Sequence, residues 1–312
     1  MTPNSSSSAP EPANDSPPIA AAILSPTRPW YWSVRRELWE NRSLYIAPLA
    51  TAAVVLFGFL ISTTWLPHKM RGLAALDPAK QAATVVMPYS FAAFMILLTA
   101  FVVGIFYCLD ALNGERRDRS ILFWKSMPVS DRTTVLAKAS LPLLALPLLV
   151  YVIIAAIWAV MFLLSTVVLL GNGSALTALW VHLPLLKMSV ALFYGLTTMA
   201  LWHAPLYSWL LLVSAWARRA TFLWAALPLL AICFFEAAAF RTSHFAHFLG
   251  YRVIGWFKEA FVAEAQSGKP MDPLMSLDPG KFLTAPGLWI GLAAAALFLA
   301  AAIRLRRNRE PM

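Results

Sequence analysis

Six long apolar stretches alternate with polar connections along the chain. They cover approximately residues 44–66, 88–109, 141–170, 192–216, 221–240 and 288–303. A run of ~20 apolar residues can cross the hydrocarbon layer as a helix, because a helix closes its backbone hydrogen bonds internally. The pattern therefore predicts an all-α membrane protein with about six transmembrane helices. A five-span arrangement, in which one weak stretch lies flat, is the alternative.

Two of the polar connections indicate further structure. Only residues 217–220 separate the fourth and fifth stretches, and so short a link predicts that these two helices are antiparallel neighbours. Residues 241–283 form the longest connection. Its apolar positions recur at helical spacing, which predicts an amphipathic helix on the outer face. These positions are Phe245, Leu249, Val253, Trp256, Phe257 and Phe261.

The region before the first stretch divides into two parts. Residues 1–29 are rich in Ser and Pro and contain no apolar run long enough for a signal-peptide core, so we expect a disordered cytoplasmic tail. Aromatic and basic residues then alternate, which favours an interfacial elbow helix at the level of the lipid headgroups. This elbow contains Trp30, Trp32, Arg35, Arg36 and Trp39. An ordinary cytoplasmic extension of the first span is the alternative.

Composition and charge agree with the apolar pattern. Hydrophobic residues make up 60% of the chain and charged residues 13%, whereas soluble domains carry about 25% charged residues. The net charge of +10 does not indicate nucleic-acid binding, because Lys and Arg concentrate at the ends of the apolar stretches. Sixteen of them lie before the first stretch, after the second, fourth and sixth, and nine lie in the longer opposite connections. This asymmetry predicts a multi-pass protein of the cytoplasmic (inner) membrane with both termini cytoplasmic and lipids as partners.

The connection between the second and third stretches, residues 110–132, has an unusual composition. Its charged first half includes Glu115, Arg116 and Arg119, and an apolar patch of Ile121, Leu122, Phe123 and Trp124 follows. Pro128 ends that patch, and Ser130 or Asp131 can cap the next helix. A short charged helix with an apolar patch can dock into a groove on another protein. The alternative is a solvated loop whose Phe123 and Trp124 dip into the membrane interface.

The same segment resembles the signature region of ABC type 2 transporter permeases. The matching residues are Asn113-Gly114-Glu115-Arg116, Arg119-Ser120-Ile121-Leu122, Lys125-Ser126-Met127-Pro128-Val129-Ser130 and Lys138. The elbow, the six-span layout and the long outer connection before the last span are similar too, so the resemblance covers most of the chain from Trp30 onward. Arg119 stands where that family usually has glycine, while Ser120 keeps the small polar position.

The resemblance implies a six-span permease domain over residues 30–312 that serves as a non-catalytic subunit of an exporter. Such a subunit pairs with a second permease copy or a paralogue and with cytosolic ABC ATPase subunits, which would contact the coupling segment Glu115 to Ser130. The chain itself has no G-x-x-x-x-G-K-[ST] phosphate loop, because Gly268-Lys269 is followed by Pro270. We therefore expect ATP and Mg to be bound by the partner and no cofactor to be bound directly.

Two polar residues inside the apolar stretches are candidates for a substrate pathway. A carboxylate at Glu236 is costly in the membrane unless it is paired, protonated or faces a cavity; hydration at the outer interface is the alternative. His203 precedes Pro205, which loosens the helix locally, and a hydrogen-bonded structural histidine is the alternative there. His244 and His247 have no third ligand at a matching spacing, so we expect no metal.

Other classes of membrane protein compete with the exporter hypothesis. An intramembrane protease needs paired aspartates, a Ser/His arrangement or H-E-x-x-H within the bilayer, and the chain has none of these. An ion-coupled secondary transporter could use Glu236 as its proton carrier, although such folds usually show internal repeats, which are not evident here. A membrane scaffold that recruits a partner through residues 110–132 is the third alternative.

Overall fold

The structure is a computed structural model that describes residues 27–73, 77–118, 130–171, 183–261 and 277–308. Throughout these ranges the chain is helical and forms no named strand, and only Phe261 and Leu277 make an isolated antiparallel bridge. The tail expected over residues 1–29 lies almost entirely outside the described residues. The first helix, α1 (Thr27–Glu40), begins inside the range predicted to be a disordered tail.

Six of the described helical stretches are long and apolar enough to cross a membrane. They are Ser43–His68, Lys80–Arg117, Asp131–Gly171, Leu185–Trp216, Thr221–Phe240 and Pro286–Asn308. Each of the six apolar ranges predicted from the sequence lies inside one of them. The second and third contain 38 and 41 residues, so at 1.5 Å per residue they extend over about 55–60 Å, well beyond the hydrocarbon layer. The architecture is that of an all-α, multi-pass membrane protein.

Several of these stretches consist of consecutive helical elements. The first contains α2 (Ser43–Ser62), the 3-10 turn η1 (Thr63–Trp65) and the start of α3 (Leu66–Leu73), and the second contains nearly all of α4 (Pro78–Asp110) and all of α5 (Asn113–Arg117). The third contains α7 (Asp131–Ser140), the π-helical segment η2 (Leu141–Ala145) and α8 (Leu146–Gly171). The last three are α10 (Leu185–Trp216), α11 (Thr221–Phe240) and α14 (Pro286–Asn308).

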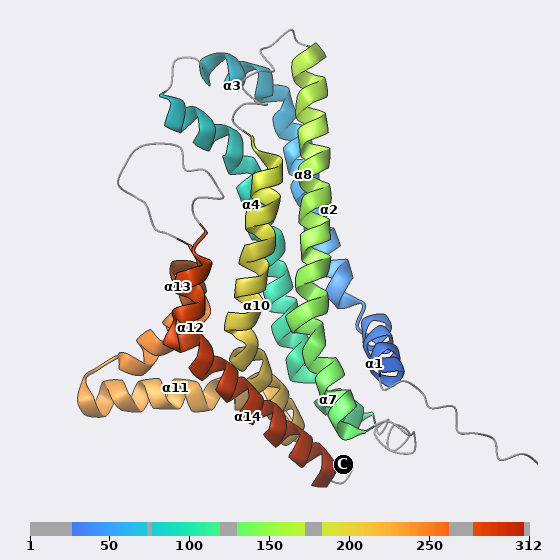
Figure 1. Ribbon diagram of the computed structural model, residues 1–312, viewed down its shortest axis with the longest axis vertical. Coiled ribbons are helices and arrows are strands. Elements are labelled where there is room, and N and C mark those ends of the chain that lie inside the picture. Colours follow the sequence, from blue (N-terminus) through green and yellow to red (C-terminus); the bar gives the residue numbers. More distant parts are fainter. Residues whose placement is uncertain (1–26, 74–76, 119–129, 172–182, 262–276, 309–312) are drawn as a thin grey trace, which may run out of the picture.

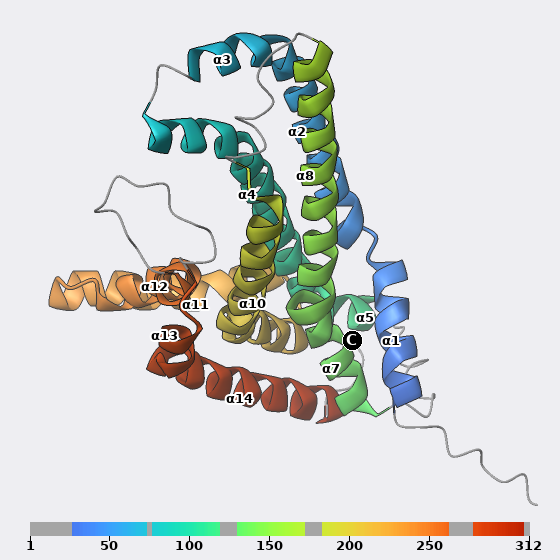
Figure 2. The same ribbon diagram turned by 45° about the horizontal axis from the view of Figure 1, so that its top comes forward.

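Helices α2, α4, α8 and α10 run alongside one another and enclose the main core (Figure 1). Tyr89, Ile96, Ile154 and Leu211 are among its fully buried side chains, and the indole of Trp158 on α8 donates a 2.9 Å hydrogen bond to the Tyr89 carbonyl on α4. Pro88 lies inside α4. Because proline cannot donate an amide hydrogen bond and its ring clashes with the preceding turn, it accounts for the bend in the N-terminal part of α4 (Figure 2).

Helix α11 departs from the predicted antiparallel pairing with α10. It leaves the end of α10 at a steep angle and projects sideways from the bundle in both views (Figures 1 and 2). The link ends at Ala220, which has a positive φ of 50°, and this left-handed residue turns the chain away from the α10 axis. The two helices still meet near the link, where the Trp216 and Trp224 rings pack edge to face with centroids 4.8 Å apart.

The predicted amphipathic helix in the longest connection is present as α12 (His244–Ala260), and the short helix α13 (Pro279–Thr284) precedes α14. Large apolar side chains are exposed on the outer faces of the long helices, among them Val54, Phe234 and Leu297. Extensive apolar exposure is unfavourable in water but matches a hydrocarbon environment. These faces are therefore suited to a membrane environment.

Candidate functional site

Charged side chains from four helices meet at one end of the molecule, where α1, α5, α7 and the C-terminal end of α14 lie together (Figure 2). We call this group the charge cluster. It contains three basic and three acidic residues, namely Arg36, Lys138 and Arg306 with Glu37, Glu115 and Asp131. The formal charges of these six residues cancel, as expected for ionised groups that are removed from water, and the exposed Glu40 adds a pair with Arg36 at the rim, at 3.5 Å.

Lys138 of α7 lies at the centre of the charge cluster. Its Nζ is 2.7 Å from Glu37 Oε1 on α1 and 3.0 Å from Glu115 Oε1 on α5. The side chains of Lys138, Glu37 and Glu115 are only 3%, 1% and 10% exposed. A buried ammonium group with two carboxylate partners has its charge balanced locally, so this residue joins three helices through one group.

Arg306 ties the C-terminal helix into the same cluster. Its Nη1 donates to Glu115 Oε2 at 2.5 Å, and its Nε donates to Asp131 Oδ1 at 3.0 Å. Although Arg306 follows a run of alanines and lies near the end of α14, its side chain is 4% exposed. The forked guanidinium therefore binds α14 to both α5 and α7, in the geometry for which arginine is suited.

The carboxylate of Glu37 receives further hydrogen bonds around its edge. Arg36 Nη2 lies 2.7 Å from Glu37 Oε1, and the Tyr107 hydroxyl of α4 donates to Glu37 Oε2 at 3.2 Å. Asn41 Nδ2 donates to the Glu37 carbonyl at 3.0 Å. Burial raises the pKa of the neighbouring Glu40, an effect that the positive charge of Arg36 opposes. Glu37 is thus a saturated acceptor, as a buried carboxylate must be.

Helix α5 is held separately against the end of α10. Arg116 Nη2 donates to the carbonyls of Ser214 and Ala217 at 2.6 and 2.8 Å. The Ser214 hydroxyl in turn accepts from the backbone amides of Leu112 and Asn113, each at 3.0 Å. Carbonyls at a helix C-terminus lack partners within the helix, and a cation there is favourable. Arg116 therefore fixes the start of the 110–132 connection to the fourth span.

The structure describes only part of the predicted coupling segment. Arg119, Ile121, Leu122, Phe123, Trp124 and Pro128 lie outside the described residues, whereas Glu115 and Arg116 are described and turn inward. Their charged groups bind other parts of this chain, and contact of the segment with an ATPase stays a prediction. Ser130 caps α7 as expected, since its hydroxyl accepts from the Thr133 amide at 3.1 Å.

The predicted elbow residues fall on different faces of α1. Arg36 joins the charge cluster, whereas Trp30, Trp32 and Trp39 are exposed. The Arg35 guanidinium lies 5.2 Å from the Trp32 ring and 4.9 Å from the Trp39 ring, a cation–π arrangement on the face directed away from the protein. Basic and indole groups gathered in this way suit a headgroup layer, so location of α1 at the membrane interface stays a prediction that this arrangement favours.

Glu236 is bound to the start of α12. Its Oε1 accepts from the Thr242 hydroxyl at 2.8 Å and from the His244 amide at 2.7 Å, and its Oε2 accepts from the Phe245 amide at 2.8 Å. Amides in the first turn of a helix have no partner within the helix, and a carboxylate satisfies them particularly well. The structure thus gives Glu236 a capping function between α11 and α12.

His203 connects α10 to α12. Its Nδ1 lies 2.8 Å from the Met199 carbonyl in the preceding turn, and its Nε2 lies 3.0 Å from the Val253 carbonyl on α12. The imidazole is buried and packs edge to face against Phe101, with centroids 5.2 Å apart. This agrees with the hydrogen-bonded structural histidine that the sequence left as an alternative to a pathway residue.

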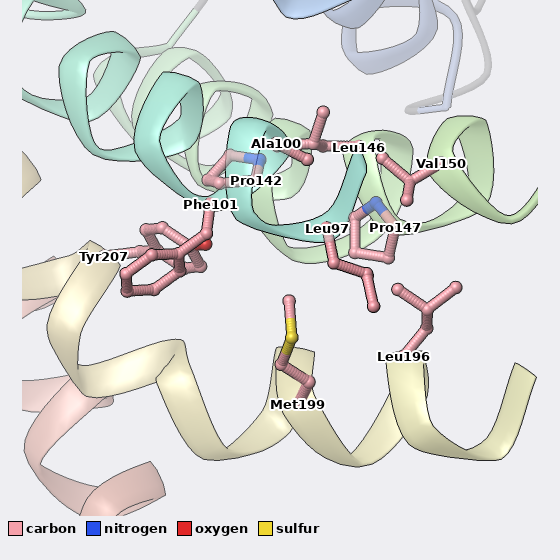
Figure 3. A pocket seen from close by; sticks show the side chains of 10 residues that line it. All are labelled: Leu97, Ala100, Phe101, Pro142, Leu146, Pro147, Val150, Leu196, Met199 and Tyr207. Carbon is pink, nitrogen blue, oxygen red and sulfur yellow. The ribbon is translucent and has the colours of Figure 1, made fainter. Parts of the chain in front are cut away.

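A small apolar cavity lies in the core between α4, α8 and α10. Its volume is about 10 Å³, close to the minimum that admits one water molecule. Figure 3 shows its lining side chains, Leu97, Ala100, Phe101, Pro142, Leu146, Pro147, Val150, Leu196, Met199 and Tyr207. This cavity therefore has room for no more than about one water molecule.

Glu37, Lys138 and Arg306 form the central contacts of the charge cluster, and no pattern in the sequence indicates directly that they meet. In the sequence, Lys138 belonged to the signature segment and Arg306 counted toward the orientation rule. One local pattern could have indicated that Glu37 is buried. It lies four residues after Ser33 and three after Val34, so all three share one face of the helix. Ser33 and Glu37 are both buried.

No protein-family model, no curated protein and no solved structure matches the chain. Among the described residues, no group of three or more His, Cys, Asp or Glu side chains is arranged to hold a metal ion.

Proposed function

We propose that this chain is the membrane-spanning permease subunit of an ABC exporter in the cytoplasmic membrane. In this proposal it works with a second permease copy or a paralogue and with separate cytosolic ATPase subunits, which bind ATP and Mg. The resemblance of residues 113–138 to the signature region of ABC type 2 permeases supports the proposal. The six helices that are long and apolar enough to span a membrane, and the location of α1, α5, α7 and the end of α14 at one end of the molecule, are consistent with it.

The charge cluster is the observation that carries the proposal furthest. The proposed coupling segment begins at α5 and ends at α7, and both flanks are bound into the cluster through Glu115 on one side and Lys138 on the other. A force applied to this segment would therefore reach α1 through Glu37 and α14 through Arg306. Energy transfer from an ATPase to membrane helices needs such a mechanical connection, and a solvated loop would not provide it.

The ion-coupled transporter is less well supported. Its most plausible proton carrier in the sequence is Glu236, but this carboxylate accepts three hydrogen bonds at the start of α12. A group that must gain and lose a proton during transport would break this cap in each cycle. A membrane scaffold that recruits a partner through residues 110–132 without transport is the second candidate. A segment whose two flanks are bound into the charge cluster could also hold such a partner.

Co-purification tests the proposal. Tagged protein is isolated in mild detergent from its native host, and the co-purifying chains are identified by mass spectrometry. We expect a chain with a G-x-x-x-x-G-K-[ST] loop to accompany the wild-type protein. The variant Phe123→Ala with Trp124→Ala should lose this chain, because it removes the apolar side chains proposed to enter the groove of the partner.

A matched control removes two adjacent aromatic rings elsewhere. Phe234 and Phe235 are exposed on α11, so Phe234→Ala with Phe235→Ala should retain the ATPase chain. Absence of any ATPase from the wild-type preparation in several detergents would contradict the exporter hypothesis. Equal loss in both double variants would show that the coupling segment is not the contact.

A further inference from the structure

The third long helix is interrupted between the charge cluster and the core cavity. Residues Leu141–Ala145 are π-helical, and the Leu146 amide bonds to the Leu141 carbonyl five residues earlier. Pro142 lies within this turn, and Pro147 lies two residues after it. Neither proline can donate to the carbonyl four residues before it, that of Lys138 or of Leu143. π-Turns and prolines are the usual sites of helix bending.

The near side of this interruption is held by the charge cluster. Lys138 lies four residues before Pro142, so its carbonyl lacks the amide donor that a regular α-helix would supply. The side chain of the same residue binds Glu37 and Glu115. Asp131, at the other end of α7, binds Arg306 at 3.0 Å. Helix α7 is thus anchored at both ends by ion pairs, and it meets α8 at an angle (Figure 1).

The far side of the interruption forms one wall of the core cavity. Pro142, Leu146 and Pro147 face side chains of α4 and α10 across it (Figure 3). The three helices also pack closely beside the cavity, because a Cβ added at Gly104 of α4 would lie 3.3 Å from Leu146 Cδ2 and 3.4 Å from the Tyr207 ring. A rotation of α7 about the π-turn would therefore move Pro142 relative to α4 and α10 while α8 keeps its contacts.

We propose that Leu141–Ala145 is a hinge that the ion pairs of Lys138 lock, and that α7 swings at this hinge while α8 stays in place, which withdraws Pro142 from the wall of the core cavity. Lys138 lies just before this turn, and the cavity-lining residues Pro142 and Leu146 lie within it and directly after it. Loss of the Lys138 contacts shifts the population toward the bent form, since those contacts exist only while α7 is docked. The inference concerns motion within this chain and does not depend on the ATPase partner proposed above.

Distance measurements between spin labels test the hinge in the purified full-length protein in lipid nanodiscs. Cys108 and Cys233 are first replaced by alanine. One label pair, Leu136→Cys with Phe248→Cys, joins exposed sites on α7 and α12 and crosses the hinge. The control pair, Leu163→Cys with Phe248→Cys, joins exposed sites on α8 and α12 and does not cross it.

We expect Lys138→Gln to add a second distance to the 136–248 pair and to leave the 163–248 pair unchanged. Adding Pro142→Ala should reduce that second population by at least half, because alanine restores the amide donor to the Lys138 carbonyl. An unchanged 136–248 distance in Lys138→Gln would overturn the proposal, as would equal changes in both pairs or a second population that Pro142→Ala does not reduce.

A second variant covers the case in which Lys138→Gln does not fold, which the loss of the 163–248 distance would reveal. Asp131→Asn breaks only the contact with Arg306 at the rim of the cluster, where the Asp131 side chain is 28% exposed. It should produce the same second 136–248 distance at a smaller population. A single unshifted 136–248 distance in Asp131→Asn would then count against the hinge.

Discussion

At the scale of single residues, the buried ions of the charge cluster depend on one another. Removing two charges from water is costly, and the mutual attraction of a buried pair repays that cost only when the geometry is good and the remaining hydrogen bonds are made. Lys138 satisfies both conditions, since two carboxylates lie within 3.0 Å of its ammonium group. Deleting one partner should therefore be more damaging than deleting a charge at the surface.

Replacement of Lys138 tests this dependence. Lys138→Gln removes the closer of the two cations that Glu37 and Glu115 share and leaves only Arg36 between them, and we expect a loss of about 3–5 kcal/mol in stability. The matched control is Lys80→Gln, because Lys80 forms an exposed pair with Asp77 and its removal should cost about 0–1 kcal/mol. Thermal unfolding in detergent measures both, and equal melting temperatures for the two variants would contradict the buried cluster.

Gly291 on α14 allows the guanidinium of Arg252 to cross the helix surface. Arg252 Nη1 donates to the Gly287 carbonyl at 2.9 Å, and its guanidinium carbon lies 4.9 Å from the Trp202 ring. Partial burial lowers the pKa of Arg252, which nevertheless stays cationic because arginine is effectively always protonated. A Cβ at position 291 would overlap the end of this side chain.

Gly291→Ala should therefore displace Arg252 from both partners and cost about 1–2 kcal/mol in thermal unfolding. Gly250→Ala on α12 is the matched control, because nothing lies within 4 Å of a Cβ there, and it should be neutral or slightly stabilising. In the Arg252→Gln background the added Gly291→Ala change should cost much less. Full additivity of the two changes would show that Gly291 does not act through Arg252.

At the scale of helical elements, α12 is fixed at its start by a residue from the preceding helix. Glu236→Gln removes the negative charge that faces the first amides of α12, and we expect the first turn of α12 to be less stable. Hydrogen exchange at His244 and Phe245 should then accelerate, while exchange in α8 should not. Glu259→Gln at the other end of α12 is the control, and acceleration in both variants would mean that Glu236 is not the cap.

The sequence predicted the elements well, because apolar length and helical spacing are local properties. The six spans, α12 and the Ser130 cap all followed from residues close together in the chain. The π-turn was missed although Pro142 and Pro147 were visible, since prolines alone do not distinguish a kink from a π-turn. The steep angle of α11 depends on the positive φ of Ala220. An alanine in the sequence does not indicate a positive φ.

The candidate site was harder to predict because its residues are distant in sequence. Glu115 and Arg306 are separated by 191 residues, and Glu37 and Lys138 by 101. No local pattern shows that such residues meet. Charges near the ends of apolar stretches are fully explained by orientation in the membrane. The sequence therefore offered no separate reason to predict contacts between them. The sequence also did not predict that Glu115 and Arg116 point inward, because a charged segment considered without its partners is expected to face water.

At the scale of the whole molecule, the account predicts on which side of the membrane each end lies. Ser130 and Arg218 are exposed close to the charge cluster and the end of α10, whereas Ser243 is exposed at the start of α12. In protein without Cys108 and Cys233, a membrane-impermeant maleimide should label Ser243→Cys in intact cells. Ser130→Cys and Arg218→Cys should react only after permeabilisation. Labelling of Ser130→Cys in intact cells would reverse the orientation inferred from the basic residues.

Site-specific photocrosslinking tests the proposed function most directly. A photoreactive amino acid is placed at position 124 in the coupling segment and, as a control, at the exposed position 234 of α11, and the native host is irradiated. The account predicts that position 124 crosslinks to a chain with a nucleotide-binding phosphate loop and that position 234 does not. If position 124 yields only lipid adducts, or a partner without that loop, this chain is not the permease subunit of an ABC exporter.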